Sequence, residues 1–404
     1  MTLSAVKIIE DLQVLSEDQN GVTRFPFTKE HEDAVSYLTA LMQKAGMSVS
    51  MDAAGTLIGR TDGSGSNKTL LMGSHQDSVR NGGAYDGIMG VVLPVLAMAA
   101  LKDKGVTLPF SVECLAFADE EGARFPTALI GPRALAGTFD PAVLDMRDVN
   151  GVSIREAMTG FGLVPDDIVT LKRDAEQVIG YVETHIEQGP LLEDENQALG
   201  VVSAICGIER HNIDIKGMAA HAGTCPMHLR VDALTCASVI IAEVERLAQN
   251  TEDLVATVGY LNVTPNVVNA VPGGASMTLE IRSPNDQIRE DFARAIQSFA
   301  ADLAAGRGAE LSMERTYSQK AQQCDPMLSD GLFDAVKDAG GTGLKLASGA
   351  THDASAMADL TPIAMLFVRC KGGVSHNPAE FCSGDDMNVA ISALASFLEN
   401  LSVA

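Results

Sequence analysis

Four short apolar runs, each followed by polar residues, constrain the fold of this chain more than any other feature. They are 68–74 (KTLLMGS), 110–119 (FSVECLAFAD), 177–185 (QVIGYVETH) and 362–368 (PIAMLFV). Runs of this length and composition indicate buried strands. A helical pattern over 87–105 lies between the first two, and such alternation is typical of α/β folds. We therefore predict a large α/β domain.

The segment from about 208 to 320 has a different pattern. It predicts a strand, a helix, two strands, a helix and a strand, which is the β-α-β-β-α-β order of ferredoxin-like domains. The expected elements are 207–217, 227–250, 253–263, 275–283, 285–306 and 309–318. We expect an insert at 208–320, with 1–207 and 321–404 forming the α/β domain. The polar stretch 62–69 predicts a hairpin turn.

The charge balance restricts the possible partners. The sequence has 29 Lys and Arg against 53 Asp and Glu, and its net charge of −24 disfavours nucleic acid and anionic membranes. No apolar run reaches the roughly 18 residues that a membrane span needs. Residues 1–21 predict an amphipathic helix and lack the pattern of a signal peptide. Seven scattered cysteines indicate reduced thiols and a cytoplasmic protein.

Each predicted strand of the large domain ends beside side chains that bind metals or move protons. These are Ser74–Asp77 and Asp86 after the first strand, Asp119–Glu121 after the second, Glu183, His185 and Glu187 around the end of the third, and His376 after the fourth. Binding sites in open α/β sheets form outside the carboxyl ends of the strands. We therefore expect these side chains to meet in one site.

The residue types match the requirements of a hydrolytic site with two divalent metal ions. Such a site needs a carboxylate between the ions, further His or carboxylate ligands, and a base beside them. The ligands would be His75, Asp86, Glu121, His185 and His376, and Glu120 would be the base. Imidazole and carboxylate without thiolate suit Zn, Mn, Co or Ni and do not choose among them. Each motif taken alone is also typical of an ordinary polar loop.

Seven motifs between Gly73 and Glu380 carry a resemblance to a known family. They are GSHQDSVRNGGAYDGIMG, FADEEGARF, ETHIEQGPLLE, GMAAHAGTCPMHLRVDA, TPNVVNAVPGGASMTLEIRSPND, SGATHDASAMA and GGVSHNPAE. In this order they resemble the M20 metallohydrolases. The HIEQGP and HAGTxPM elements resemble its amidase branch of N-carbamoyl-L-amino-acid hydrolases, β-ureidopropionases and allantoate amidohydrolases. The resemblance implies a di-metal aminopeptidase-like α/β domain with a ferredoxin-like lid that also forms a homodimer.

The resemblance also implies roles for individual residues. One ion would be held by His75, Asp86 and His185, and the other by Asp86, Glu121 and His376, with Asp86 bridging. Glu120 would be the general base that activates water. His221 of the lid would reach into the partner subunit's site and polarise the scissile carbonyl.

Five residues are candidates for holding a small-molecule carboxylate substrate. They are Gln188, Asn269, Arg282, His352 and His211. The resemblance implies that Arg282 grips the carboxylate, in a bidentate contact that fixes orientation. For His352 a purely structural role is an open alternative, and for His211 substrate contact stays open.

The implied function is hydrolysis of the C–N bond of an N-carbamoyl amino acid or related ureido acid, which releases ammonia, CO2 and the amine. Two other enzymatic functions stay open: an allantoate or ureidoglycolate amidohydrolase, and an aminoacylase or dipeptidase that cleaves an acyl amide. A metal-bound scaffold without turnover is disfavoured, because Glu120 stands beside Glu121.

Some residues depart from the family pattern or carry other expectations. Thr351 would narrow the pocket. Arg80 is expected to extend into solvent, with contact to a second negative group of the substrate as an open alternative. Arg369 would meet an acidic substrate or offset nearby acids. These departures leave the substrate open. Cys225 is expected to be a buried, inert thiol, and His31 a surface or capping residue, like His228.

Overall fold

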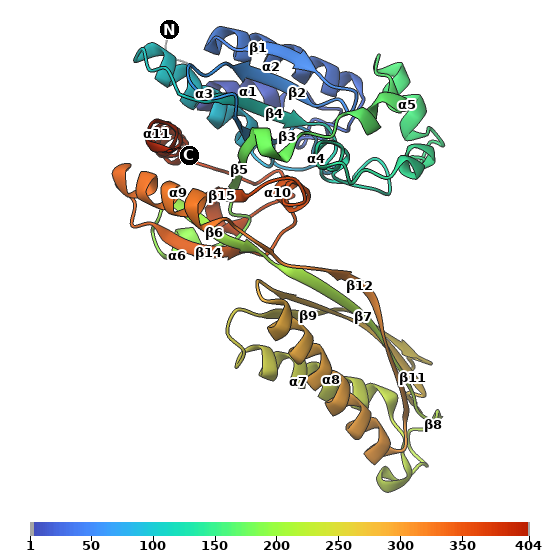
Figure 1. The fold of residues 1–404 in the computed structure, drawn as a ribbon. Coiled ribbons are helices and arrows are strands. Elements are labelled where there is room, and N and C mark those ends of the chain that lie inside the picture. The colour runs from blue at the N-terminus through green and yellow to red at the C-terminus, as the bar shows by residue number, and fades with distance from the viewer. Residues whose placement is uncertain (1–3, 403–404) are drawn as a thin grey trace. The chain divides into compact units, whose positions relative to one another are not determined.

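The computed structural model describes residues 4–402, and these form two compact units (Figure 1). Unit 1 contains the described residues up to Ser203, together with Cys324–Leu346 and those from Ala350 onward. Unit 2 contains Ala204–Gln323 and the short segment Ala347–Gly349. The chain thus leaves unit 1, builds unit 2 and returns to unit 1.

A mixed nine-stranded sheet is the framework of unit 1. Its strands are β1 (Ser48–Met51), β2 (Leu57–Thr61), β3 (Thr69–His75), β4 (Ser111–Phe117), β5 (Val178–Ile186), β6 (Leu199–Ile205), β14 (Leu344–Ser348) and β15 (Ile363–Val368). The ninth strand, β13 (Gln322–Gln323), belongs to unit 2 and pairs with Ala204 and Ile205, the residues of β6 that also belong to unit 2. Their order is β1-β2-β4-β3-β5-β15-β6-β13, and β14 pairs with β6. Because β4, β3, β5 and β15 run parallel, their carboxyl ends share one edge of the sheet.

The four parallel strands are the apolar runs predicted from the sequence, and the mixed α/β fold is confirmed. Every residue of β3, β4 and β15 is buried, as expected for strands covered on both faces. The helices of this unit are α1 (Ala5–Gln13), α2 (Lys29–Ala45), α3 (Ile88–Asp103), α4 (Ile130–Ala136), α5 (Ile154–Gly160), α6 (Leu191–Asp194), α9 (Pro326–Asp338), α10 (Asp353–Met357) and α11 (Gly384–Asn400). Of these, α3 is apolar on almost all sides because it packs between the sheet and α1, α2 and α11.

Unit 2 is a four-stranded antiparallel sheet in the order β12-β7-β11-β9, together with two long helices. Its elements are β7 (Gly207–Lys216), β8 (Ala220–His221), α7 (Ala233–Ala248), β9 (Val255–Thr264), β10 (Ala270–Val271), β11 (Gly274–Ser283), α8 (Asp286–Arg307) and β12 (Glu310–Gln319). Burial alternates along β7 and β11, so that one face of the sheet packs on the helices. The core of this unit is therefore separate from that of unit 1.

Three local predictions were wrong. The first helix was predicted over 1–21, but α1 ends at Gln13, where turn-forming residues follow; residues 1–3 lie outside the described residues. The helix predicted over 227–250 begins at Ala233, because the Asp232 side chain caps its first turn by accepting from the Thr235 N–H. The stretch 62–69 is not a hairpin, because β2 pairs with β4 and β3 lies on the other side of β4.

All seven cysteines are free, and six of them are buried. The prediction of a buried thiol was wrong for Cys225, which is half-buried in the loop that follows β8. Among residues 4–402, no helix combines the length and the apolar character that crossing a membrane requires.

Candidate metal centre

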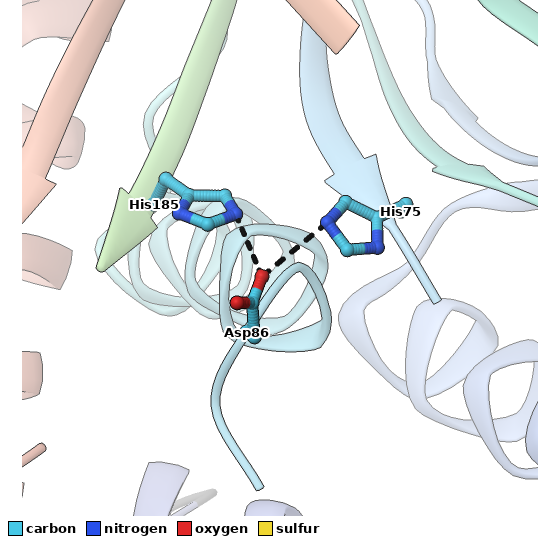
Figure 2. A group of neighbouring side chains, drawn as sticks. All are labelled: His75, Asp86 and His185. Atoms are coloured by element: carbon cyan, nitrogen blue, oxygen red, sulfur yellow. Dashed lines mark ion pairs between the residues drawn. The ribbon is translucent and has the colours of Figure 1, made fainter. Parts of the chain in front are cut away.

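The carboxyl edge of the unit 1 sheet brings three predicted ligands together (Figure 2). His75 is the last residue of β3, His185 lies near the end of β5, and Asp86 is in the loop that leads into α3. Asp86 Oδ1 lies 3.5 Å from His75 Nε2 and 3.1 Å from His185 Nε2. All three side chains are buried. The sheet topology thus converges side chains that are far apart in the sequence.

Backbone carbonyls orient both of these imidazoles. The His75 Nδ1 lies 3.0 Å from the carbonyl oxygen of Asp77, and the His185 Nδ1 lies 2.9 Å from that of Ile186. A carbonyl only accepts, so each Nδ1 carries a proton, and each Nε2 is the ring nitrogen that faces Asp86. A histidine that binds a metal through Nε2 has its proton on Nδ1.

A second cluster uses the other oxygen of the same aspartate. His376 Nε2 lies 3.4 Å from Asp86 Oδ2 and 3.6 Å from Glu121 Oε2. The ligand atoms of Asp86, Glu121 and His376 all lie within 4.8 Å of one another, as do those of the first cluster. The two clusters therefore share Asp86, whose two oxygens face different partners. Unlike the other two histidines, His376 is half exposed.

Asp77 positions the acids that follow β4. Its carboxylate accepts the backbone N–H of Glu120 at 3.1 Å and that of Glu121 at 3.2 Å. Asp77 Oδ1 also lies 3.4 Å from His75 Nδ1, as expected for a carboxylate that orients this imidazole. Glu120 Oε2 is 4.0 Å from His75 Nε2, which puts the predicted base beside the first cluster.

The electrostatics of these acids fit divalent cations. Burial raises the pKa of Glu121 to about 8, and the negative charge of Asp86 adds to this effect. Burial also raises the pKa of Glu120 well above its ordinary value, against the opposing effect of His75. The Oε1 atom of Glu121 is buried without a hydrogen-bond partner. Buried acids that disfavour one another's charge, together with imidazole nitrogens aimed among them, form a donor set suited to divalent metal ions.

Gly87 is required by the close packing of this loop. Its φ is +64°, and a Cβ there would lie 2.3 Å from the His75 ring. A side chain at this position would therefore displace a predicted ligand, and the backbone conformation is one that glycine adopts at little cost. The glycines around Asp86 thus let the loop pass against the imidazole.

Two candidate substrate residues of unit 1, Gln188 and His352, lie beside the proposed ligands. Gln188 was expected to contact substrate, but it contacts Asp86. The Gln188 amide donates to Asp86 Oδ2 at 2.9 Å and to Ser375 Oγ at 3.1 Å, and the Ser375 hydroxyl donates to Asp86 Oδ2 at 2.8 Å. His352 is buried with its ring centroid 4.6 Å from that of His185. In this structure Gln188 therefore holds the shared aspartate.

The other candidates belong to unit 2, and two of them are paired there. His211 is buried, and its Nε2 lies 2.8 Å from Glu209 Oε1. Arg282 donates from Nε to Glu280 at 2.8 Å, and its Nη2 lies 2.7 Å from the same oxygen. By contrast, His221 and Asn269 are exposed on this unit.

The structure shows the surroundings of Arg369, Arg80 and Thr351, the residues that depart from the family pattern. Arg369 forms a two-pronged ion pair with Asp386, at 3.0 and 2.8 Å, so it offsets an acid. Arg80 is 56% exposed on its side chain, as expected, and lies near Asp18 and over the Phe25 ring. Thr351 is half-buried.

The surface placement of His31 was wrong. It is 1% exposed, and its Nδ1 accepts the Phe27 N–H at 2.8 Å at the start of α2, while its ring stacks on Phe161. Burial lowers the pKa of His31 to about 3, and the charge of Arg24 adds to this effect. His31 thus keeps the capping role but is a neutral core residue.

Sequence reasoning placed Glu183 at the site without assigning it a role, and it missed Glu380; both carboxylates support the site. Glu183 accepts the Ser74 hydroxyl and the Ala354 N–H, both at 2.8 Å, and so joins β3, β5 and α10. Glu380, four residues after His376, accepts two N–H groups of the Asp86 loop. Its position in the last motif was the one available signal.

The fold and the site together define a class: the chain belongs to peptidase family M20/M25/M40, which its residues 71–400 match. One relative is an N-carbamoyl-L-amino acid amidohydrolase of Geobacillus stearothermophilus, 39% identical over 96% of this chain and 95% of that protein. Another is an allantoate deiminase of Arabidopsis thaliana, 35% identical over 98% of this chain and 82% of that protein. A crystal structure described as a hydantoinase/carbamoylase family amidase from Burkholderia multivorans matches with a TM-score of 0.92, 29% identity, and coverage of 98% and 97% of the two chains.

Proposed function

We propose that this protein is a metal-dependent amidohydrolase that cleaves the C–N bond of an N-carbamoyl amino acid or a related ureido acid. Water adds to the ureido carbon and the C–N bond breaks, giving the free amine and carbamate, which decomposes to CO2 and ammonia. The observation that carries the proposal is the shared Asp86, which stands between two clusters of histidine and carboxylate. Similarity to N-carbamoyl-amino-acid amidohydrolases along nearly the whole chain supports this reaction class.

The two clusters would hold two divalent ions, Zn, Mn, Co or Ni. The first ion would be bound by His75, Asp86 and His185, and the second by Asp86, Glu121 and His376. Bound ions would supply positive charge that polarises a carbonyl oxygen and makes water more acidic. The fixed direction of the Nε2 atoms of His75 and His185 and the unpaired oxygen of Glu121 support this assignment.

Glu120 is the proton carrier of the proposed mechanism. Its carboxylate takes a proton from the attacking water and delivers it to the departing nitrogen. Two features support this role: the N–H of Glu120 is fixed by Asp77, and Oε2 lies beside His75. Because the reaction needs the same group to accept and to release a proton, a carboxyl in a buried site suits it.

Residues of unit 2 would bind the substrate and complete the site from a partner subunit. In this proposal residues 208–320 would form a ferredoxin-like lid between the catalytic parts 1–207 and 321–404. In a homodimer built through these lids, His221 would donate to the oxygen that develops negative charge. Asn269 and Arg282 would hold the substrate, the latter through its carboxylate, with Gln188, His352 and His211 as further contacts. The exposure of His221 supports a role in trans.

A second candidate function is an allantoate or ureidoglycolate amidohydrolase. The observation that favours it is the 35% identity to an allantoate deiminase over 98% of this chain. The reaction would use the same residues, because allantoate is also a ureido acid. Seven free thiols further support a cytoplasmic location for either enzyme.

Product analysis tests the proposal. The purified protein would be loaded with Mn, Zn, Co or Ni and given carbamoyl-amino acids, ureidopropionate, allantoate, ureidoglycolate and acyl-amino acids. We expect ammonia and CO2 in equal amounts, together with the amine, from a carbamoyl-amino acid. Turnover of allantoate in preference would favour the second candidate. Turnover of acyl-amino acids alone would contradict both and indicate an aminoacylase or dipeptidase.

A further inference from the structure

Glu380 is a buried carboxylate that holds the loop carrying Asp86. It is 4% exposed, and its Oε1 accepts the backbone N–H of Tyr85 at 2.9 Å and that of Asp86 at 3.0 Å. Glu380 lies 295 positions from Tyr85 and 294 from Asp86 in the sequence, and the whole of unit 2 lies between them. Hydrogen bonds from N–H groups to a carboxylate are among the stronger ones in proteins. The contact therefore fixes the backbone directly beneath the Asp86 side chain.

Gly83 gives independent evidence that this contact is built into the fold. A Cβ at Gly83 would lie 2.2 Å from Glu380 Cδ and Oε1, and 2.4 Å from its Cβ. Real atoms do not approach this closely, so any side chain at position 83 would displace Glu380. At the other end of the loop Gly87 packs against His75. The segment 83–87 is thus held between Glu380 and a predicted ligand.

We propose that Glu380 is a positioning residue for the shared carboxylate, and that it sets the affinity of the centre for divalent cations. The inference rests on the proposed function, in which Asp86 bridges both ions. Glu380 and His376 lie in one segment, so the contact also ties the ligand of the second cluster to the loop that supplies the shared ligand. Partners behind metal ligands typically change metal affinity or activity about 10–100-fold when removed.

Three substitutions of Glu380 separate positioning from charge. Glu380→Gln keeps an oxygen that accepts both N–H groups but removes the charge. Glu380→Asp keeps the charge, but its shorter side chain moves the carboxylate away from the two N–H groups. Glu380→Ala removes both the charge and the accepting oxygen. We expect the dissociation constant for Mn, measured by calorimetry on metal-free protein, to rise about 10–100-fold for Ala and Asp and only a few-fold for Gln. The Michaelis constant with saturating Mn should change little.

Gly83→Ala is a second route to the same effect, since it displaces Glu380 without altering it. We expect its Mn affinity to fall as in Glu380→Ala. Glu195→Ala, at an exposed glutamate of the same unit, is the matched control and should bind Mn like the wild type. Circular dichroism of the metal-free proteins checks that each variant folds. If Glu380→Ala does not fold, the comparison of Glu380→Gln with Glu380→Asp still tests the inference.

The outcomes distinguish this inference from the proposed function. If wild-type protein binds Mn and Glu380→Asp binds it equally well while Glu380→Gln does not, Glu380 acts through its charge and the inference is wrong. Unchanged affinity in Glu380→Ala and Gly83→Ala would also overturn it. If the wild type itself binds no divalent cation, the proposed function fails before the inference is reached.

Discussion

His75 and His185 of unit 1 and His221 of unit 2 are placed in opposite ways. His75 and His185 are 2% and 1% exposed, and backbone carbonyls orient their rings. His221 is exposed at the end of a two-residue strand, and its Nδ1 accepts the Gly223 N–H. Buried, pre-oriented nitrogens suit permanent ligands, whereas an exposed imidazole suits a contact made only on assembly. Unit 1 thus contains all of the proposed metal ligands, whereas the proposed groups of unit 2 would act only against another surface.

The largest effect is expected at the residue that both clusters share. Asp86→Ala should remove both sites, because each loses its common carboxylate. Activity should fall by about 10⁴-fold or more, since bound metal ions contribute several kcal/mol to such reactions. Metal content after dialysis, measured by mass spectrometry, should drop in parallel. If the Asp86→Ala protein keeps its full metal content, Asp86 is not a shared metal ligand, and the proposed assignment of ligands in unit 1 is wrong.

Glu120→Gln should have a smaller effect of a different kind. The amide does not carry the proton, so kcat should fall about 10³-fold, within the range of general acid–base catalysis. Metal content should stay that of the wild type, because Glu120 is not among the proposed ligands. A variant with unchanged kcat would rule out the role of Glu120, and lost metal would show that it is a ligand.

His221→Ala should lower kcat about 10²-fold, the loss typical of one donor to a developing oxyanion. The matched control is His228→Ala, an exposed histidine of the same unit, which should be unaffected.

Mixed dimers give the sharper test of His221. In a dimer of one His221→Ala chain and one Glu120→Gln chain, one site receives intact Glu120 and intact His221. Co-expression should therefore restore about a quarter of wild-type activity from two nearly inactive chains, if random pairing makes half of the C2 dimers mixed. No recovery in dimers proven to be mixed would place His221 in its own chain's site or outside catalysis.

The smallest effect is expected at His31, a buried histidine that is not a proposed metal ligand. His31 is as buried as the proposed ligands His75 and His185, but its Nδ1 accepts the Phe27 N–H. Because its pKa is lowered to about 3, only the unfolded chain takes up the proton as the pH falls below about 6.5, so stability is lost in that range. At pH 5 this loss is up to about 2 kcal/mol.

His31→Asn should remove this pH dependence, because an amide oxygen can accept the same N–H without titrating. Urea unfolding of metal-free protein at pH 7 and pH 5 measures it, with His228→Asn as the exposed control. Equal losses of stability in wild type and His31→Asn would contradict the assignment.

The sequence predicted those parts of the molecule that short stretches of residues determine by their own pattern of apolar and polar side chains. The strands β3, β4, β5 and β15 were found because both of their faces are buried, which makes them continuous apolar runs. Residues at the ends of those strands had to meet once the strands were parallel, so the cluster around Asp86 followed. Short edge strands such as β1 carry mixed residues and gave no comparable signal.

Long-range contacts were beyond this reasoning. Gln188 donates to the Asp86 side chain, and Glu380 accepts the backbone N–H of Asp86. Both contacts depend on loop conformations, which the periodic pattern of apolar residues does not predict. The hairpin expected at 62–69 failed for a related reason, since β4 inserts between β2 and β3 from a later part of the chain. The burial of His31 likewise depends on a distant partner, Phe161.

The most direct test of the account is electron paramagnetic resonance of the protein loaded to saturation with Mn(II). Two ions that share the carboxylate of Asp86 are close enough to couple their spins, and we predict the multiline spectrum of a coupled pair. A spectrum that shows only the sextet of isolated Mn(II) at full loading would contradict a shared aspartate between two cations.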